Sequence, residues 1–426
     1  MAELIENTIL GINISHDTSI AVVKDGVLVD VFEEERCRRK KYWAPTPGEE
    51  TRLQSIEQKI NTESIDEIVF TSFDRRAYDY NIDKVLSHDR LATREFMQDM
   101  TECQLSRERL EDLENRYVDL FTFAGGGDED DNGDLLIADE LAEHHFDLPE
   151  GEYQYNVDHH THHAWCGFSL APEDMTDALV ITMDGGGCRK RWDDYPTHQE
   201  IESIYFGDLN EEGDKQIVPL YQKLSNYRFV ADLSEQLPNE LYDCLMSTSV
   251  DSFTDNDVDY EMVSTPSMGM NFSNLSFALG TDKLGRAAGK VMGMASYGSD
   301  NKHVYNRYNI GYTLEVDSFE YTCNLIQKAI DYKPDCRNII LSGGFSLNCT
   351  NNYKYLSAFP DYQIFVDPIP HDGGTAAGAA LQMYAAMVQK DEVMPGEEYT
   401  KPSVWDAEEE QQEQEPKVHP KIVLKI

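Results

Sequence analysis

The sequence contains few basic residues and no paired cysteines. Its 36 Lys and Arg residues face 79 Asp and Glu residues, which gives a formal net charge of -43 at pH 7. A surface of this charge repels phosphate backbones and anionic membranes, so it argues against non-specific nucleic-acid binding unless a local basic patch overrides it. The eight cysteines form no CxxC pair and show no even spacing. We expect separate, reduced thiols in a cytoplasm.

Long apolar runs and a targeting segment are also absent from the sequence. No apolar run reaches the roughly 18 residues of a membrane-spanning helix, so no membrane partner is expected. Residues 1–7 are polar and acidic, unlike a secretory signal, and a cytoplasmic location is expected, in a bacterium or in a host cell if the protein is viral. Hydrophobic residues make up 40% of the 426 positions, enough for two or three compact units.

Two stretches of the sequence repeat the same order of elements. Residues 8–14 (TILGINI) predict a short apolar strand before a polar loop, and strands over 19–23 and 27–32 follow, joined by an Asp-Gly hairpin turn. In the middle of the chain, the apolar run 178–183 (ALVITM) leads into an acidic glycine loop and a strand over 202–206. This repetition predicts an internally duplicated α/β protein, whose two loops can face each other across a cleft.

The rest of the chain supplies helices and two more strands. Helices are predicted over 51–116, 318–332 and 374–388, and buried strands over 338–341 and 363–366. From residue 390 the chain is acidic, Gln/Glu-rich and punctuated by proline, which is typical of a weakly ordered tail.

Four histidines stand within five positions of the sequence. They are His159, His160, His162 and His163, a third of the 12 histidines in the chain. On a helix, His159 and His163 lie one turn apart and point the same way, so their imidazoles can hold one transition metal with coordination positions left open. The alternative is a polar, half-exposed helix start without a ligand, and the motif alone leaves both interpretations open.

Four glycine-rich loops lie near the ends of predicted strands. They are 184–187 (DGGG), 285–298 (GRAAGKVMGMASYG), 342–348 (SGGFSLN) and 372–378 (DGGTAAG). Glycine lets the backbone turn its N–H groups towards phosphate oxygens, and a following helix N-terminus adds a favourable dipole. One such loop is an ordinary turn, but four predict a nucleotide site, although none fits the P-loop or dinucleotide pattern. The candidate nucleotide-binding residues in these loops are Asp184, Gly185, Gly186, Gly187, Lys290 and Gly373.

Basic residues are concentrated in two short runs. The denser run, 33–41 (EEERCRRKK), follows the third predicted strand, and Arg189-Lys190-Arg191 lies just beyond the DGGG loop. Arginine binds phosphate bidentately and lysine binds it as a point charge, so the first run is a candidate edge for phosphate or acceptor binding. The alternative is a solvated strand end. The candidate contacts are Arg36, Arg38, Arg39, Lys40 and Lys41.

Two further loops carry candidate acid–base or metal-binding side chains. His16 and Asp17 lie in the first loop, and a histidine near a carboxylate can act as general base on an acceptor hydroxyl. The alternative is a turn-stabilising aspartate beside an uninvolved histidine. Asp372 opens the last glycine loop, and a carboxylate with two imidazoles is a plausible metal set, although the loop alone does not select it.

The order of these motifs resembles that of the O-carbamoyltransferases that modify nodulation factors and antibiotics. The matching segments are GINISHDTSIAVVKDG, EEERCRRKK, HHTHHA, ALVITMDGGG, GKVMGMASYG, LSGGFSLNC and DPIPHDGGTAAGAAL. They cover roughly residues 9–384, and although each segment is weak alone, seven in the same order are specific.

The resemblance implies a duplicated actin-like ATPase (ribonuclease H-like) fold with two lobes around a nucleotide cleft. Related threonylcarbamoyl-tRNA synthesis enzymes share this fold. The implied domains are a first lobe over 1–170 with the histidine helix, a second lobe over 171–388 with the glycine loops, and an acidic, weakly ordered tail over 389–426.

The resemblance also implies the reaction and its cofactors. A carbamoyl group passes from carbamoyl phosphate, with ATP and through carbamoyladenylate, to an acceptor hydroxyl; Fe(II) is the expected metal and Mg²⁺ a further candidate. The implied metal ligands are His159, His163 and Asp372, with His160 and His162 supporting them or facing the acceptor. The implied nucleotide contacts are Gly343, Gly344 and Asn348, and the implied residues near the acceptor are His16 and Asp17. Arg36 is a candidate to stabilise negative charge on the carbamoyl oxygen.

Typical family members carry a further C-terminal domain related to the one that makes the adenylate, whereas only about 40 residues follow Met387. Either one compact cleft performs both steps, or a separate adenylate-forming partner supplies the activated carbamoyl group. The alternatives are a tRNA threonylcarbamoyl-type transferase, a plain ATPase, or a non-catalytic nucleotide-binding partner. Candidate acceptors are a hydroxymethylated pyrimidine in DNA or a nucleotide, or a sugar or small metabolite. A homodimer is the default expectation.

Overall fold

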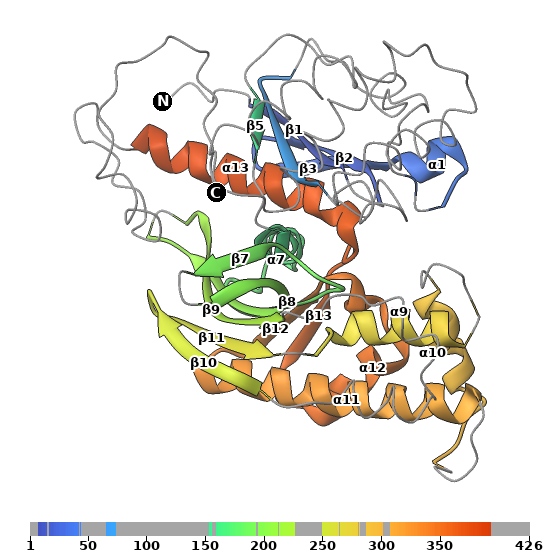
Figure 1. Ribbon diagram of the computed structural model, residues 1–426. Coiled ribbons are helices and arrows are strands. Elements are labelled where there is room, and N and C mark those ends of the chain that lie inside the picture. Colours follow the sequence, from blue (N-terminus) through green and yellow to red (C-terminus); the bar gives the residue numbers. More distant parts are fainter. Residues whose placement is uncertain are drawn as a thin grey trace. The chain divides into compact units, whose positions relative to one another are not determined.

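The chain forms two compact units, which are described one at a time from a computed structural model (Figure 1). The first comprises Met1–His162, Asp372–Glu397 and Glu409–Ile426, and the second comprises His163–His371 and Glu398–Glu408. The structure describes residues 7–14, 17–41, 43, 65–73, 153–155, 159–192, 195–211, 213–225, 249–263, 265–279, 281, 287–300 and 307–392. The lobes over 1–170 and 171–388 and the tail over 389–426 stay predictions. Within the described ranges, no helix is long and apolar enough to span a membrane.

The first unit is built on a five-stranded sheet in the order β3-β2-β1-β4-β5. Its strands are β1 (Thr8–Ile14), β2 (Ser19–Lys24), β3 (Val27–Glu33), β4 (Glu67–Phe73) and β5 (Tyr153–Tyr155). β1, β2 and β3 form the predicted antiparallel meander, whereas β4 runs parallel to β1, and β5 parallel to β4. Asp25 and Gly26 turn the hairpin between β2 and β3 with φ of 50° and 76°, the positive values that an Asp-Gly turn supplies.

Strand β4 lies within the stretch 51–116, where the sequence predicts mostly helix, and this part of the prediction is wrong. Its sequence, EIVFTSF, is rich in β-branched and aromatic residues, which pack well on a pleated surface. Parallel pairing with β1, whose Ile9 and Ile12 are fully buried, provides that surface. Apart from residues 65–66, the remainder of the stretch lies outside the described residues.

One long helix, α13 (Thr375–Glu392), packs against this sheet (Figure 1). It confirms the helix predicted over 374–388 and continues past its expected end. Gly11 permits the close approach, because a Cβ there would lie 2.0 Å from the carbonyl oxygen of Ala376 on the helix. The buried contacts between helix and strands include Ile9, Val23, Ala379, Ala380 and Met383.

The second unit is built on an eight-stranded sheet in the order β10-β11-β9-β8-β6-β12-β13, with β7 paired to β8. Its strands are β6 (Ala178–Met183), β7 (Arg189–Trp192), β8 (Tyr195–Leu209), β9 (Lys215–Ser225), β10 (Ser249–Asp255), β11 (Val258–Val263), β12 (Asn338–Ser342) and β13 (Gln363–Val366). β6, β8 and β9 are successive antiparallel neighbours, while β12 runs parallel to β6, and β13 parallel to β12. The order β9-β8-β6-β12-β13 therefore repeats β3-β2-β1-β4-β5, strand directions included. This recurrence confirms the duplicated, actin-like (ribonuclease H-like) α/β fold.

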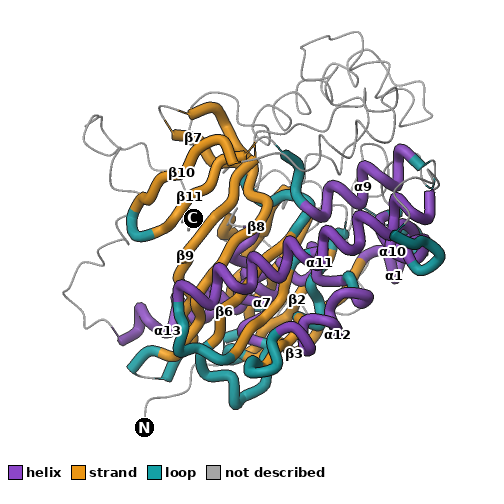
Figure 2. The backbone as a smooth tube through the Cα atoms, turned by 90° about the horizontal axis from the view of Figure 1, so that it is seen from below, coloured by secondary structure: helices purple, strands orange, loops and turns teal. Residues whose placement is uncertain are grey.

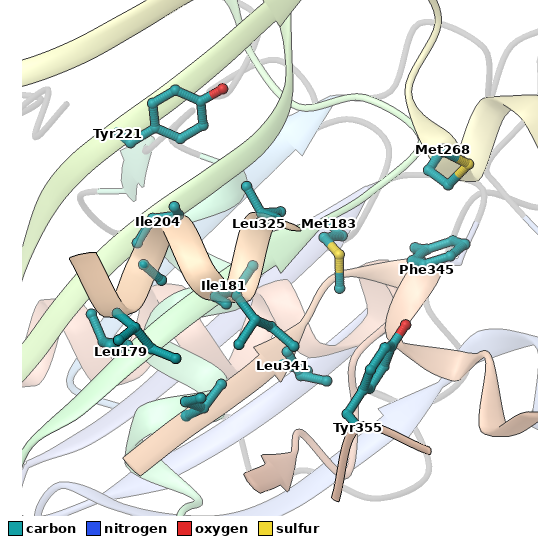
Figure 3. Close-up of a cluster of buried hydrophobic side chains, with 14 of the residues drawn as sticks. Leu179, Ile181, Met183, Ile204, Tyr221, Met268, Leu325, Leu341, Phe345 and Tyr355 are labelled. Atoms are coloured by element: carbon teal, nitrogen blue, oxygen red, sulfur yellow. The ribbon is translucent and has the colours of Figure 1, made fainter. Parts of the chain in front are cut away.

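Helices cover both faces of the central strand β6. On one face, Leu179, Ile181 and Met183 pack with residues of α9 (Met268–Ala278) and α11 (Arg307–Tyr332) (Figure 3). On the other face, Val180 packs with Phe168 of α7 (His159–Ser169). Burial on both faces explains why ALVITM is apolar throughout.

Other described segments of the second unit also contribute to this core, including the buried Val291, Phe345 and Tyr355. Figure 2 shows β8, β9 and β11 side by side, with α11 passing over them. The predicted helix over 318–332 is the C-terminal part of α11, and the strands predicted over 338–341 and 363–366 are β12 and β13. Further described helices and turns are α1 (Glu34–Arg38) in the first unit and α10 (Ala288–Ala295), η5 (Gly344–Leu347) and α12 (Cys349–Ala358) in the second.

Replacing Gly11 with alanine should destabilise the first unit. The added Cβ would lie 2.0 Å from the carbonyl oxygen of Ala376, so either β1 or α13 must shift. Overpacking of this kind costs about 1 to 3 kcal/mol, and urea unfolding of Gly11→Ala should report a loss of that size. Gly293→Ala is the control, because a Cβ there meets nothing within 4 Å and alanine favours helix. Equal unfolding midpoints for Gly11→Ala and the unchanged protein would contradict the packing described for α13.

Candidate metal and nucleotide site

Helix α7 begins at the first histidine of the cluster, and all four imidazoles are buried. His160, His162 and His163 have no exposed surface, and His159 is 4% exposed. The half-exposed helix start, one of the two interpretations of the motif, is therefore wrong. His159 and His163 lie one turn apart along the helix, as the spacing predicts. Buried imidazoles require polar or metal partners, so the surroundings of this helix contain candidate ligands.

In the first unit, His159 meets Asp372. Nε2 of His159 lies 3.6 Å from Oδ1 of Asp372, and both side chains are almost fully buried. This separation is long for a hydrogen bond but suits two atoms that each bind a shared metal at about 2.0 to 2.2 Å. Asp372 stands in the turn η6 (Asp372–Gly374), where the carbonyl of Gly373 accepts a hydrogen bond from Ser19 at 2.9 Å. The loop before α13 is thereby tied to strand β2.

Two side chains donate to the carbonyl of Asp372: Thr375 at 2.6 Å, and Asn13, which sequence reasoning missed. Its Nδ2 donates to the carbonyl oxygens of Asp372 at 3.0 Å and Asp17 at 3.1 Å. Its Oδ1 accepts from the hydroxyl of Thr71 at 3.3 Å. Asn13 thus ties together the loop after β1, the loop of Asp372 and strand β4. The signal that could have identified Asn13 is its position as a polar residue inside the apolar run TILGINI.

In the second unit, Asp184 ends strand β6 and links two glycine loops. Its Oδ1 accepts the N–H of Gly344 at 3.1 Å, and its Oδ2 lies 3.5 Å from the N–H of Gly186. Gly343 has φ of 85°, and a Cβ there would lie 2.3 Å from the carbonyl oxygen of Met183. Only glycine fits that turn, so the structure brings Asp184, Gly186, Gly343 and Gly344 together as the loop motifs predict.

The DGGG loop is held from both sides. The carbonyl of Gly185 accepts from the hydroxyl of Ser267 at 2.8 Å, next to the start of α9. The N–H of Gly187 donates to the carbonyl of Glu200 at 2.8 Å, on strand β8. A Cβ at Gly185 would meet nothing within 4 Å, so the backbone is open at that point.

Two other predicted nucleotide residues have local structural roles. The side chain of Asn348 caps α12 by accepting from the N–H of Asn351 at 3.3 Å. Lys290 is exposed on α10, and its Nζ donates to the carbonyl of Thr281 at 3.1 Å. Contact with a nucleotide stays a prediction for both residues.

The basic run after β3 is largely engaged with its own acidic neighbours. Nε of Arg36 donates to Oε2 of Glu33 at 2.7 Å, and this bond raises the pKa of the guanidinium. Nε of Arg38 donates to Oε2 of the fully buried Glu34 at 3.0 Å, and its guanidinium lies 4.0 Å from the ring centre of Trp43. Arg38 therefore has a structural role, and the phosphate or acceptor contacts of this run stay predictions.

The remaining predicted residues of the first unit are less informative. Arg39, Lys40 and Lys41 are exposed beyond α1, where a basic edge was expected. Asp17 is half-buried, and its backbone carbonyl is held by Asn13. His16 lies outside the described residues, so its pairing with Asp17 stays a prediction.

The family of the chain follows from its match to a described protein family. The model of the family described as "Carbamoyltransferase N-terminus" matches residues 8–333 and 312–381. The chain belongs to this family. The match extends over both sheets, the histidine helix and the glycine loops, so the resemblance inferred from the order of motifs is confirmed.

Other members and more distant proteins are similar to parts of this carbamoyltransferase-family chain. An uncharacterised protein of Synechocystis sp. is 25% identical over 409 residues, which cover 91% of this chain and 60% of that protein. T. kodakarensis HypF has a TM-score of 0.45 and 12% identity, covering 90% of this chain and 48% of that one. Full-length HypF in a phosphate- and nucleotide-bound form has a TM-score of 0.43 and 12% identity, covering 89% and 56%. The chain thus spans less than two thirds of the length of these proteins.

Replacing Asn13 with alanine should destabilise the first unit by about 1 to 3 kcal/mol in urea unfolding, because the carbonyls of Asp372 and Asp17 lose the amide donor, although Asp372 keeps the hydroxyl of Thr375 at 2.6 Å. Thr71→Val is the matched control. It removes one hydroxyl from the same group of hydrogen bonds and leaves Asn13 in place, so its effect should be smaller. A larger loss for Thr71→Val than for Asn13→Ala would show that Asn13 is not the residue that holds this loop.

Proposed function

We propose that this chain binds ATP and a divalent transition metal and transfers a carbamoyl group from carbamoyl phosphate, through carbamoyladenylate, to an acceptor hydroxyl. The observation that supports it most is the buried pair of His159 and Asp372 at the start of the histidine helix. Membership of the carbamoyltransferase N-terminus family supports the type of group transferred. In this proposal the carbamoyl group is activated either by this chain or by a separate adenylate-forming partner.

The available side chains fit a metal of the Fe(II) type. His159 and Asp372 in the first unit form one pair whose ligand atoms lie within 4.8 Å, and His163 and Asp184 in the second unit form another. The resemblance implies that His159, His163 and Asp372 bind the proposed ion, and Asp184 is a fourth candidate ligand in this proposal. Imidazoles with carboxylates suit Fe(II) and neighbouring divalent metals. When bound, the ion would polarise nucleotide phosphate oxygens as a Lewis acid.

The backbone of the glycine loops is proposed to bind the nucleotide phosphates. Gly185 offers open backbone, and Gly343 takes the positive φ of the turn in which the N–H of Gly344 donates to Asp184. Asn348 caps α12 directly after this loop, and the helix N-terminus favours negative charge. Phosphate binding at this point needs no P-loop sequence.

The transfer step needs a base and donors for the carbamoyl oxygen. The acceptor hydroxyl attacks the carbamoyl carbon, and its proton passes to a base. The bond between the carbamoyl carbon and the phosphate oxygen then breaks, and AMP leaves with its electron pair. Asp17 and His16 are proposed to orient that hydroxyl and take its proton, since Asn13 holds the loop of Asp17. Backbone N–H groups or Arg36 stabilise the charge that develops on the carbamoyl oxygen. Exclusion of water from the site would protect the intermediate from hydrolysis.

Each of four single substitutions should lower the affinity for one and the same metal ion. His159→Ala, His163→Ala, Asp184→Asn and Asp372→Asn each remove one proposed ligand, and the loss should be at least about tenfold for each. Metal analysis of the anaerobically loaded protein should give one ion per chain before substitution, and carbamoyl transfer should fall together with metal content.

Asp335→Asn is the control, because this aspartate is exposed and away from the four proposed ligands. Loss of metal in His159→Ala and Asp372→Asn with normal content in the other two variants would show that the second pair belongs to no shared site. Full metal content in all four variants would overturn the metal site.

Incubation with ATP, carbamoyl phosphate and acceptor should add one carbamoyl group to the acceptor and release AMP. The acceptors to compare are hydroxymethylated pyrimidines, free or in DNA, and small sugars, with mass spectrometry as the readout. Omission of carbamoyl phosphate is the control. If DNA is the acceptor, activity should fall steeply with salt and with loss of Arg39, Lys40 and Lys41.

Activity that does not change with salt would point to a small acceptor. AMP release without transfer would mean that the chain makes the adenylate and the true acceptor is another molecule. No AMP under any condition would leave this chain as the nucleotide-binding partner of a separate adenylate-forming protein.

A further inference from the structure

A buried aspartate in the second unit ends a short chain of hydrogen bonds behind helix α7. Asp367 is 2% exposed, and its Oδ2 lies 2.6 Å from Oγ of Ser342. The same Oγ lies 3.0 Å from the carbonyl oxygen of His163. Oδ1 of Asp367 accepts from the N–H of Ile369 at 2.8 Å and from the thiol of Cys166 at 3.7 Å.

The number of hydrogens shared among Asp367, Ser342 and the carbonyl of His163 indicates the charge of Asp367. The hydroxyl of Ser342 carries one hydrogen and faces two oxygens. If Asp367 is ionised, that hydrogen goes to Oδ2, and the serine oxygen then faces the carbonyl of His163 with no hydrogen between them. If Oδ2 carries a proton, it donates to Ser342, and Ser342 donates to His163. Only the protonated acid places a hydrogen in both short contacts of the Ser342 oxygen.

The surroundings of Asp367 favour the neutral acid. Burial raises the pKa of Asp367, and hydrogen bonds from Ser342 and Ile369 and the charge of His163 offset this in part. Burial also raises the pKa of the Cys166 thiol well above its usual value, so Cys166 stays neutral. Cys166 and His163 of α7 are the titratable groups that act on Asp367, and β12 contributes the uncharged Ser342.

We propose that Asp367 is a positioning residue that acts as a neutral carboxylic acid and holds helix α7 through Ser342, so that His163 presents its imidazole at a fixed place. The helix lies directly on the strand ends here, because a Cβ at Gly167 would be 3.0 Å from Ile340 and 3.5 Å from Ser342. The consequence for metal binding rests on the proposed function, in which His163 is a ligand. The protonation state of Asp367 is independent of the proposed function.

Substitutions at Asp367 separate a neutral acid from an anion. Asn places an N–H donor and a carbonyl acceptor where the neutral acid has its hydroxyl and carbonyl, whereas Leu keeps the same branching without either. We expect Co²⁺ affinity to fall about 10- to 100-fold in Asp367→Leu and Ser342→Ala but less than about threefold in Asp367→Asn. The Co²⁺ absorption spectrum should change in the first two variants and stay the same in the third. A loss in Asp367→Asn as large as in Asp367→Leu would overturn the proposal.

Unfolding of the metal-free full chain tests protonation independently of any metal. A raised pKa in the folded state means that the proton stabilises the fold at acid pH and that this stability is lost as the pH rises through the folded value. Relative to Asp367→Asn, the unchanged protein should therefore lose stability as the pH rises from about 4 towards 8. A constant difference would overturn the neutral acid. If the unchanged protein binds no Co²⁺, the proposed metal site fails, and the unfolding comparison still decides the state of Asp367.

Discussion

The burial of four imidazoles at the start of α7 is the constraint on which the rest of the structure depends. A helix that hides this many polar rings is stable only if the backbone around it is placed closely enough to satisfy them. Glycines provide that closeness within each unit. A Cβ at Gly378 of α13 would lie 1.8 Å from the carbonyl of His162, and a Cβ at Gly167 would lie 3.0 Å from Ile340. Helix α7 is therefore located by close backbone contacts in each unit.

Each unit adds one polar anchor of the same kind. In the first, Asn13 at the end of β1 donates to the backbone carbonyl of Asp372. In the second, Ser342 at the end of β12 lies within hydrogen-bonding distance of the backbone carbonyl of His163. Neither anchor uses a ligand atom of the residue that it holds. A proposed ligand is thus oriented through its main chain, and its side chain keeps its full coordinating capacity.

Local sequence patterns predicted the frame of the fold, while tertiary contacts decided the rest. The Asp-Gly hairpin and the apolar run ALVITM needed no information beyond their neighbours. Residues 227–271 gave no clear prediction. Strand β10 is polar and acidic and forms by pairing with β11, which alternates acidic with buried apolar residues and pairs with β9. The meeting of His159 and Asp372 follows from the packing of α13, which spacing cannot show. The motif order of the family suggested that pair; nothing in the sequence pointed to Asp367 as a buried acid.

A chain with a net charge of -43 must neutralise every carboxylate that it buries. Glu34 is neutralised by an ion pair with Arg38 at 3.0 Å, and burial raises the pKa of Glu202, which accepts a hydrogen bond from the hydroxyl of Tyr321 at 2.8 Å. In our proposal Asp367 is neutralised by a proton, and because it lies behind α7 its charge state affects a metal bound through that helix. An anion behind α7 would offset part of the charge of a metal bound through the same helix. A neutral acid holds the helix through Ser342 and leaves the charge of the ion for the phosphates of the nucleotide.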